Sequence, residues 1–123
     1  MAGPTPGAVV TTQVGAIGLL ICHDLVYPAT VHEVVARRPR LLAVSTAWVG
    51  DEEPLPSSWS AVSRLLGPAP LVVANRGGAE GAVRFSDPSA ILTDGRPPIL
   101  SAKGSASEIV YGPFCPPAQN RIV

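Results

Sequence analysis

The segment GLLICHDLVYP, residues 18–28, is an apolar run that ends abruptly on a cysteine, a histidine and an aspartate. Its first residues belong to a longer apolar run, VGAIGLLIC (14–22), and this short apolar pattern is typical of a buried strand. Two further apolar runs of strand length follow, LLAVST (41–46) and LVVAN (71–75). Such strands, when they alternate with helices, favour an α/β layer whose sheet is covered by helices on at least one face.

Two predicted helices separate these strands. The first begins at Pro28, which suits the first turn of a helix, and stops at Pro39. Its valines recur on one helical face. The second helix is capped by Ser57 or Ser58, both residue types that favour the N-cap, and it ends at Gly67.

The C-terminal part of the sequence indicates further strands. SAILT (89–93), ILSAK (99–103) and SEIVYG (107–112) are short runs with tight connections such as DGRPP between them. This arrangement predicts antiparallel strands joined by turns. The predicted fold is therefore α/β, with a strand-rich C-terminal half.

Length and composition fit a single domain. The chain has 123 residues, of which 46% are hydrophobic, so it can bury a modest core. We expect a flexible leader over residues 1–8, a domain over 9–112 and a proline-rich tail over 113–123. The first residues lack the basic and apolar regions of a secretory signal.

The charge balance argues against two classes of partner. Nine basic and nine acidic residues give a net charge of zero, which offers no attraction for nucleic acid or an anionic membrane. The longest apolar run, Ile17–Ile21, is too short to span a membrane. Because only 15% of the residues are charged, much of the surface must be apolar, which favours a protein partner.

The cysteines suit a reducing compartment. Cys22 and Cys115 do not make a disulfide framework, and two free thiols are expected in the cytoplasm. Together with the two histidines they match no zinc spacing. We therefore expect neither a metal nor another cofactor.

Cys22 has two interpretations. The end of a strand that leads into a helix is where α/β proteins place reacting groups, and a thiol there can act as a nucleophile. Cysteine is also among the residues most often buried, and it commonly only packs in a core. The local sequence leaves both roles open.

The two residues after Cys22 do not complete a triad with it. Neighbours on a strand point to opposite faces, so His23 is not placed to act as the base for Cys22. Its backbone N–H is better placed, as a donor to an oxyanion beside the nucleophile. Asp24 is expected to cap the following turn, and His32 to lie on the side of its helix.

Four stretches, taken in order, resemble the nitrilase superfamily, the carbon–nitrogen hydrolases. GAIGLLICHDLVYP (15–28) resembles the nucleophile segment, in which I-C-x-D and a proline follow an apolar strand. LLAVSTAW (41–48) resembles the next strand and its Ala-Trp end. The stretch from Trp59 to LVVANRGG, and FSDPSAILTDG (85–95), resemble the helix, strand and hairpin that follow. The likeness extends over most of the chain.

The resemblance implies part of an α-β-β-α sandwich, the fold of a family whose members pair into dimers. It also implies hydrolysis of a small-molecule amide or nitrile through a cysteine thioester, without metal. Cys22 would be the catalytic nucleophile and the His23 N–H an oxyanion donor. Asp24, Trp48 and Asn75 would be supporting or substrate-side residues.

The sequence departs from the family at the two other catalytic positions. The family's glutamate base and lysine precede the cysteine, whereas the residues before Cys22 include neither type, and Lys103 is the only lysine in the chain. Asp87 also stands where the hairpin motif usually has glycine. The chain is therefore expected to resemble the C-terminal half of such an enzyme and to be incomplete by itself.

Three functions remain open from the sequence. The first is a carbon–nitrogen hydrolase of amidase or nitrilase type whose other half is supplied by a complementing chain. The second is a catalytically inactive binding or assembly module derived from the same fold. The third is an unrelated small α/β domain with a core cysteine. The expected protein partner is a second copy, in a homo-oligomer, or an N-terminal-half chain.

Overall fold

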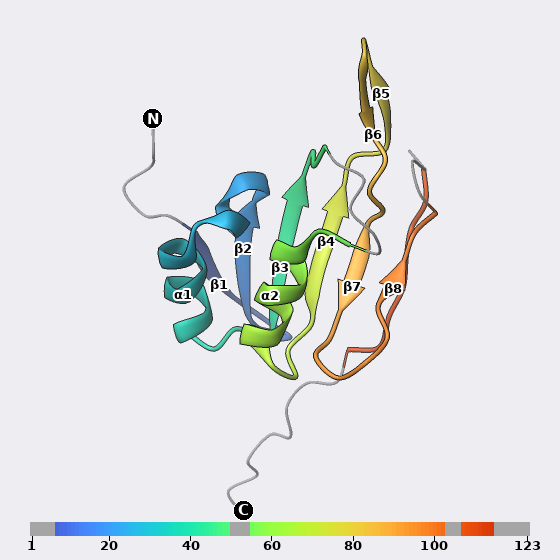
Figure 1. Cartoon of the computed structure of the whole chain (residues 1–123). Helices are drawn as coiled ribbons and strands as arrows, with labels where there is room; N and C mark the ends of the chain where they lie inside the picture. The colour runs from blue at the N-terminus through green and yellow to red at the C-terminus, as the bar shows by residue number, and fades with distance from the viewer. Residues whose placement is uncertain (1–6, 50–54, 103–106, 115–123) are drawn as a thin grey trace, which may run out of the picture.

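The structure, a computed structural model, describes residues 7–49, 55–102 and 107–114 (Figure 1). Within these residues it has a mixed sheet, a separate hairpin, two α-helices and a short 3₁₀ helix. Along the chain the elements are β1 (Ala8–Thr12), β2 (Gly15–Ile21), η1 (Cys22–Val26), α1 (Pro28–Ala36), β3 (Leu41–Thr46), α2 (Ser57–Leu66), β4 (Leu71–Asn75), β5 (Gly78–Glu80), β6 (Val83–Phe85), β7 (Ala90–Leu92) and β8 (Ile99–Leu100).

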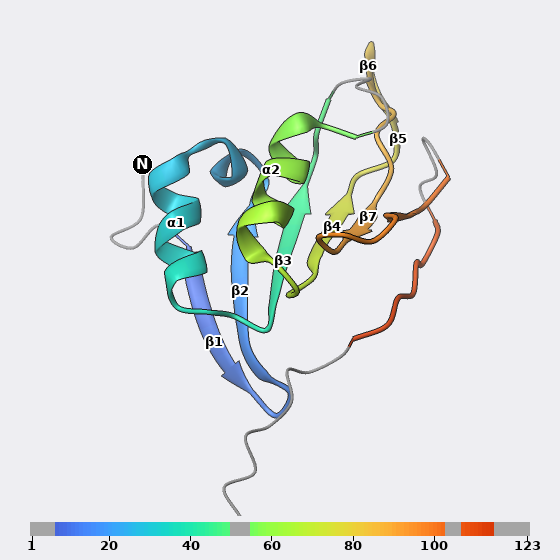
Figure 2. The ribbon, with the colours of Figure 1, turned by 60° about the horizontal axis from the view of Figure 1, so that its bottom comes forward.

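The main sheet has six strands in the order β1-β2-β3-β4-β7-β8. Its centre is parallel, because β2 pairs with β3 and β3 with β4, and α1 and α2 form the crossovers between them. On either side of this centre the pairing is antiparallel. Figures 1 and 2 show both helices on the same face of the sheet. The predicted α/β fold is confirmed, including both crossover helices.

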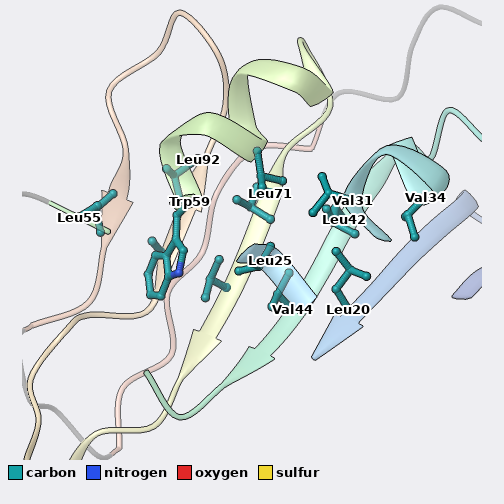
Figure 3. Packing of buried hydrophobic residues seen from close by; sticks show 13 residues of the cluster. Leu20, Leu25, Val31, Val34, Leu42, Val44, Leu55, Trp59, Leu71 and Leu92 are labelled. Carbon is teal, nitrogen blue, oxygen red and sulfur yellow. The ribbon is translucent and has the colours of Figure 1, made fainter. Parts of the chain in front are cut away.

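The helix-covered face of the sheet carries the hydrophobic core (Figure 3). Strand geometry sends alternate side chains to opposite faces, and Leu20, Leu42 and Leu71 point toward the helices with at most 2% exposed. Trp59 of α2 is fully buried above them. The buried cluster comprises Leu20, Leu25, Val31, Val34, Leu42, Val44, Leu55, Trp59, Val62, Leu71, Val73, Ala90 and Leu92.

A glycine lets α1 approach the sheet closely. A Cβ on Gly18 would lie 2.7 Å from Val34 Cγ1 and 2.9 Å from Leu42 Cδ1, which is closer than real contacts allow. Glycine in the interior of a strand often marks such an approach. The residue that interrupts the apolar run of β2 is therefore the point where helix and sheet meet.

The other face of the sheet is apolar as well, but no helix of the described residues covers it (Figure 2). We call it the open face. Its side chains alternate with those of the core and lie in register across strands, as in Val10–Ile17–Leu41. Ile21 is 70% exposed there. The open face comprises Val10, Ile17, Leu19, Ile21, Leu41, Ala43, Val72, Ile91 and Ile99.

The N-terminal strand was not predicted. Ala8 was expected at the end of a flexible leader, yet it begins β1 and pairs with Leu19. The β-branched run from Val9 to Thr12 favours a strand, and the turn closes because Gly15 takes a φ of +110°. The run is too short to be identified by pattern alone. Residues 1–6 of the expected leader lie outside the described residues.

The predicted strand at 107–112 is wrong. This segment has no ladder pairing; instead it lies against the open face at its β7–β8 side. A Cβ on Gly112 would be 2.9 Å from Ile99 Cδ1 and 3.0 Å from Ile91 Cδ1. In place of backbone pairing, Gly112 packs on these two isoleucines, and the Ala102 N–H donates to Glu108 Oε2 at 2.8 Å. Residues 115–123, the main part of the expected tail, lie outside the described residues.

Three smaller differences concern local signals. The predicted serine cap of α2 is wrong, because Pro56 is the N-cap residue and makes no side-chain cap hydrogen bond, and Ser57 and Ser58 lie within the helix. The strand expected over ILSAK extends only over β8, and Lys103 lies outside the described residues. The glycine-rich stretch after β4 forms the unpredicted hairpin β5–β6.

Among the described helices, none is long and apolar enough to cross a membrane.

Candidate active site

Cys22 lies at the turn between β2 and η1. Its φ is +45°, in the left-handed region, which costs a residue with a Cβ on the order of 1 kcal/mol. Strained backbone clusters at functional sites, and a sharp strand-to-helix turn presents a side chain at its tip. The thiol is free and the residue is half-buried. This geometry favours presentation of the sulfur over simple core packing.

Asp24 fastens this turn. Its Oδ2 accepts a hydrogen bond from the Ile21 N–H at 2.9 Å, and its carbonyl accepts one from the Tyr27 N–H at 3.2 Å. These two bonds fix the backbone on both sides of Cys22. Asp24 therefore acts as the expected cap of the turn, with its carboxylate directed to the backbone.

The imidazole of His23 belongs to a row of aromatic rings. It stacks on Trp48, with ring centroids 6.3 Å apart and planes at 27°, and meets the edge of Tyr27 at 5.8 Å. Trp48 in turn meets the edge of the buried Trp59 at 6.0 Å. The row links the turn that carries Cys22 to the hydrophobic core.

Asn75 joins the ends of β3 and β4. Its Oδ1 accepts hydrogen bonds from the Thr46 hydroxyl at 2.5 Å and from the Trp48 N–H at 2.8 Å. Its Nδ2 donates to the Asp87 carbonyl at 2.9 Å, and its backbone N–H donates to Ser89 Oγ at 2.9 Å. The amide thus holds Trp48 in place, and with it the surface on which His23 stacks.

These contacts bring the predicted site residues to one edge of the sheet. The carboxyl ends of the parallel strands β2, β3 and β4 meet there, as the register Ile21–Ser45 and Thr46–Asn75 requires (Figure 1). Reacting groups in open α/β sheets lie at such an edge. His32, by contrast, is exposed on α1, as expected.

Sequence reasoning missed part of this edge. Tyr27 was not singled out, and neither were Thr46 and Ser89, whose hydroxyls bind Asn75. A polar residue at the end of each apolar strand was the available signal. The positive φ of Cys22 had no signal in its local sequence. Within the described ranges, no group of three or more histidine, cysteine or acidic side chains is placed to hold a metal ion.

The fold resembles that of several solved structures. No family model and no curated protein matches the sequence. Among solved structures, a cysteine-to-alanine mutant of the nitrilase-superfamily amidase from Nesterenkonia AN1 matches with a TM-score of 0.74 and 27% identity. The match covers 87% of this chain and 41% of that one. A crystal structure of an amidase from Nesterenkonia sp. gives a TM-score of 0.73, 27% identity and the same coverage.

A third match bears on the chemistry of that relative. A glutamate-to-glutamine mutant of the same amidase carries the acetamide moiety of fluoroacetamide on its active site cysteine. It matches with a TM-score of 0.72 and 28% identity over 84% of this chain and 40% of that one. The chain therefore spans about two fifths of the length of these relatives. Its predicted resemblance is confirmed: the chain has part of the fold of a nitrilase-superfamily amidase.

Proposed function

We propose that this chain carries the nucleophile of a carbon–nitrogen hydrolase of amidase or nitrilase type, and that Cys22 is that nucleophile. The observation that supports the proposal most strongly is the strained, half-buried position of Cys22 at the end of β2. It occurs in a fold that matches an amidase whose own active site uses a cysteine.

The reaction assigned to Cys22 is acyl transfer. Its sulfur forms a bond to the carbonyl carbon of a small amide, and the C=O electron pair moves to oxygen. When the tetrahedral intermediate collapses, the C–N bond breaks, the nitrogen leaves with a proton as ammonia or an amine, and a thioester remains. Water then cleaves the thioester to the acid and restores the thiol.

The neighbouring residues have supporting roles in this proposal. His23 is early in η1, where backbone N–H groups have no carbonyl partner within the helix, so its N–H donates to the oxyanion. Asp24 holds the turn in the conformation that presents the sulfur. Trp48, fixed by Asn75, provides an aromatic wall on the substrate side.

Efficient turnover requires two groups that we assign to another polypeptide segment. A general base and a charged oxyanion donor are each worth orders of magnitude in rate. The family uses a glutamate and a lysine, and the only lysine of this sequence, Lys103, does not match that position. The apolar open face is the surface on which the complementary part would pack. A free Cys22 thiol suits the cytoplasm as the compartment.

An activated ester tests the nucleophile without the missing groups. In a Cys115→Ala background, p-nitrophenyl acetate should release one equivalent of p-nitrophenolate per chain in a burst and then stall, because nothing activates water for deacylation. Mass spectrometry should find the acetyl group on Cys22. The burst should be faster than for the urea-unfolded chain. A native rate equal to or below the unfolded rate would refute the proposal.

A catalytically inactive assembly module is the second candidate function. The exposed open face favours it, since Ile21 and Leu19 are 70% and 41% exposed on a sheet that is otherwise well packed. In this case the partner is a second copy of the chain or an N-terminal-half chain, and Cys22 only packs. A native chain without a burst, but with stable self-association, would support this function.

A further inference from the structure

A cavity lies at the end of the sheet opposite to Cys22. It has a volume of about 600 Å³ and is bounded by the C-terminal ends of α1 and α2 and by the segments that lead into β3 and β4. Its walls are mainly apolar, with Val35, Leu66 and Pro70 among them. Small-molecule sites have this size and this apolar lining, together with a few polar groups that orient the ligand.

The charged groups of this cavity are arginines, and Thr93 adds a hydroxyl. Arg38, Arg40 and Arg96 line it, and its lining includes neither aspartate nor glutamate. The two ion pairs found within the described ranges are Arg37–Glu33 and Arg76–Glu80, so Arg38 and Arg96 have no carboxylate partner there. We call this cavity the arginine pocket. Guanidinium groups bind carboxylate and phosphate by paired, charge-assisted hydrogen bonds.

Arg38 occupies a position that favours glycine. Its φ is +50°, and its N–H donates to the Val35 carbonyl at 2.9 Å, so it ends α1 in the left-handed conformation. Helices commonly end this way on glycine, whereas a side chain there is strained. Strained residues cluster at functional sites, so the charged side chain of Arg38 is a candidate for a binding role.

Arg40 is fixed by the turn between β1 and β2. Its Nη1 donates to the Val14 carbonyl at 3.3 Å, and its side chain lies where a Cβ on Gly15 would be, 2.3 Å from Cδ. Its backbone N–H donates to the Ala16 carbonyl at 2.8 Å. One wall of the arginine pocket is therefore preorganised, which lowers the entropy cost of binding.

We propose that the arginine pocket binds an organic anion with an apolar body, its carboxylate or phosphate facing Arg38 and Arg96. The charge of the lining selects an anion, and the leucine and proline walls select a ligand with an apolar part. Arginines near helix C-terminal ends also compensate the helix dipole, which by itself would require no ligand. The site is separate from Cys22 and does not depend on the proposed hydrolase function.

Calorimetric titration tests the proposal with four probes: octyl phosphate, octanoate, octanol and inorganic phosphate. We expect octyl phosphate or octanoate to bind with a Kd of about 1 mM or tighter, and octanol and inorganic phosphate at least about tenfold more weakly. The tighter of the two anions identifies the head group. The affinity should fall as salt is added. Octanol binding as tightly as both anions, or no binding by either anion, would overturn the proposal.

Variants separate binding from structure. Arg38→Gln/Arg96→Gln should weaken binding of the preferred anion by about tenfold or more, whereas Arg84→Gln, an exposed arginine outside the pocket, should not change it. Arg38→Gly should weaken binding while raising the unfolding midpoint, because it relieves the left-handed strain. Cys22→Ser should bind as the wild type does. Unchanged affinity in the double variant would contradict the proposal.

Discussion

The two faces of the main sheet are built from the same strands and are equally apolar, yet they differ in cover. Leu20 on the helix-covered face is 2% exposed, while its neighbour Ile21 on the open face is 70% exposed. Strands with apolar residues on both faces are typical of sheets buried on both sides. The comparison shows that the sheet has the composition of a central layer, although the helices of the described residues cover only one side of it and Gly112 approaches only the β7–β8 part of the other.

The largest expected effect is a difference in stability between variants of the two faces. Leu42→Ala removes a fully buried side chain from the covered face and should lower the free energy of unfolding by about 2–5 kcal/mol. Leu19→Ala on the open face should cost about 0.5 kcal/mol, because Leu19 is 41% exposed. Urea unfolding of both variants measures the difference. Equal losses that do not depend on protein concentration would mean that the open face is covered within the chain itself.

Enlarging a side chain should also destabilise the covered face more than the open face, but by less than Leu42→Ala does. Gly18→Ala places a Cβ against Val34 and Leu42, so it should destabilise the fold by about 1–3 kcal/mol. Ala43→Val on the open face adds more atoms but should stay within about 0.5 kcal/mol of the wild type. Thermal unfolding compares them. A neutral Gly18→Ala would show that α1 moves away easily.

The strand end that carries Cys22 should respond to backbone freedom. Glycine ordinarily destabilises a fold relative to alanine, but at a φ of +45° Cys22→Gly should be about 1 kcal/mol more stable than Cys22→Ala. Urea unfolding of the two variants measures this. The opposite order would mean that the left-handed turn is not populated.

The smallest expected effect on stability comes from a double variant of the open face, which should still clearly reduce self-association. Leu19→Lys/Ile21→Lys should change the free energy of unfolding by no more than about 1 kcal/mol, because both side chains are exposed. It should nevertheless reduce sedimentation-detected self-association and hydrophobic dye binding several-fold. The control is Val49→Lys/Val83→Lys, which changes two exposed valines outside the open face. If the control reduces association equally, the open face is not the contact surface.

The parallel centre of the fold could be predicted from sequence because its signals are local. The apolar runs at 41–46 and 71–75 became β3 and β4 with the predicted bounds, and Pro28 begins α1. The ends of the chain could not be predicted in the same way. β1 exists because it pairs with β2, and Gly112 packs on Ile91 and Ile99, which are contacts that the pattern of a single segment does not reveal.

The candidate site shows the same division. Cys22 could be singled out because it follows an apolar strand and precedes a helical turn, and Asp24 caps that turn as predicted. The positive φ of Cys22 and the bond from Trp48 to Asn75 depend on how strand ends meet in space. The arginine pocket had no local signal either, because its arginines come from two connections that are distant in the sequence, α1–β3 and β7–β8.

The most direct test of the central claim, that the fold presents Cys22 as a nucleophile, is capture by fluoroacetamide in a Cys115→Ala background. Fluoride is a poor leaving group, so ordinary thiols react slowly with this reagent. A glutamate-to-leucine mutant of the Nesterenkonia amidase still carries the acetamide moiety of fluoroacetamide on its active site cysteine. Capture therefore tests the Cys22 thiol without requiring a glutamate base.

The measurement is the rate of acetamide addition to Cys22, followed by mass spectrometry, in the native chain and in the same chain unfolded in urea. Our account predicts that the native chain reacts faster, because the turn at the end of β2 presents the sulfur. A native chain that reacts no faster than the unfolded one would contradict it.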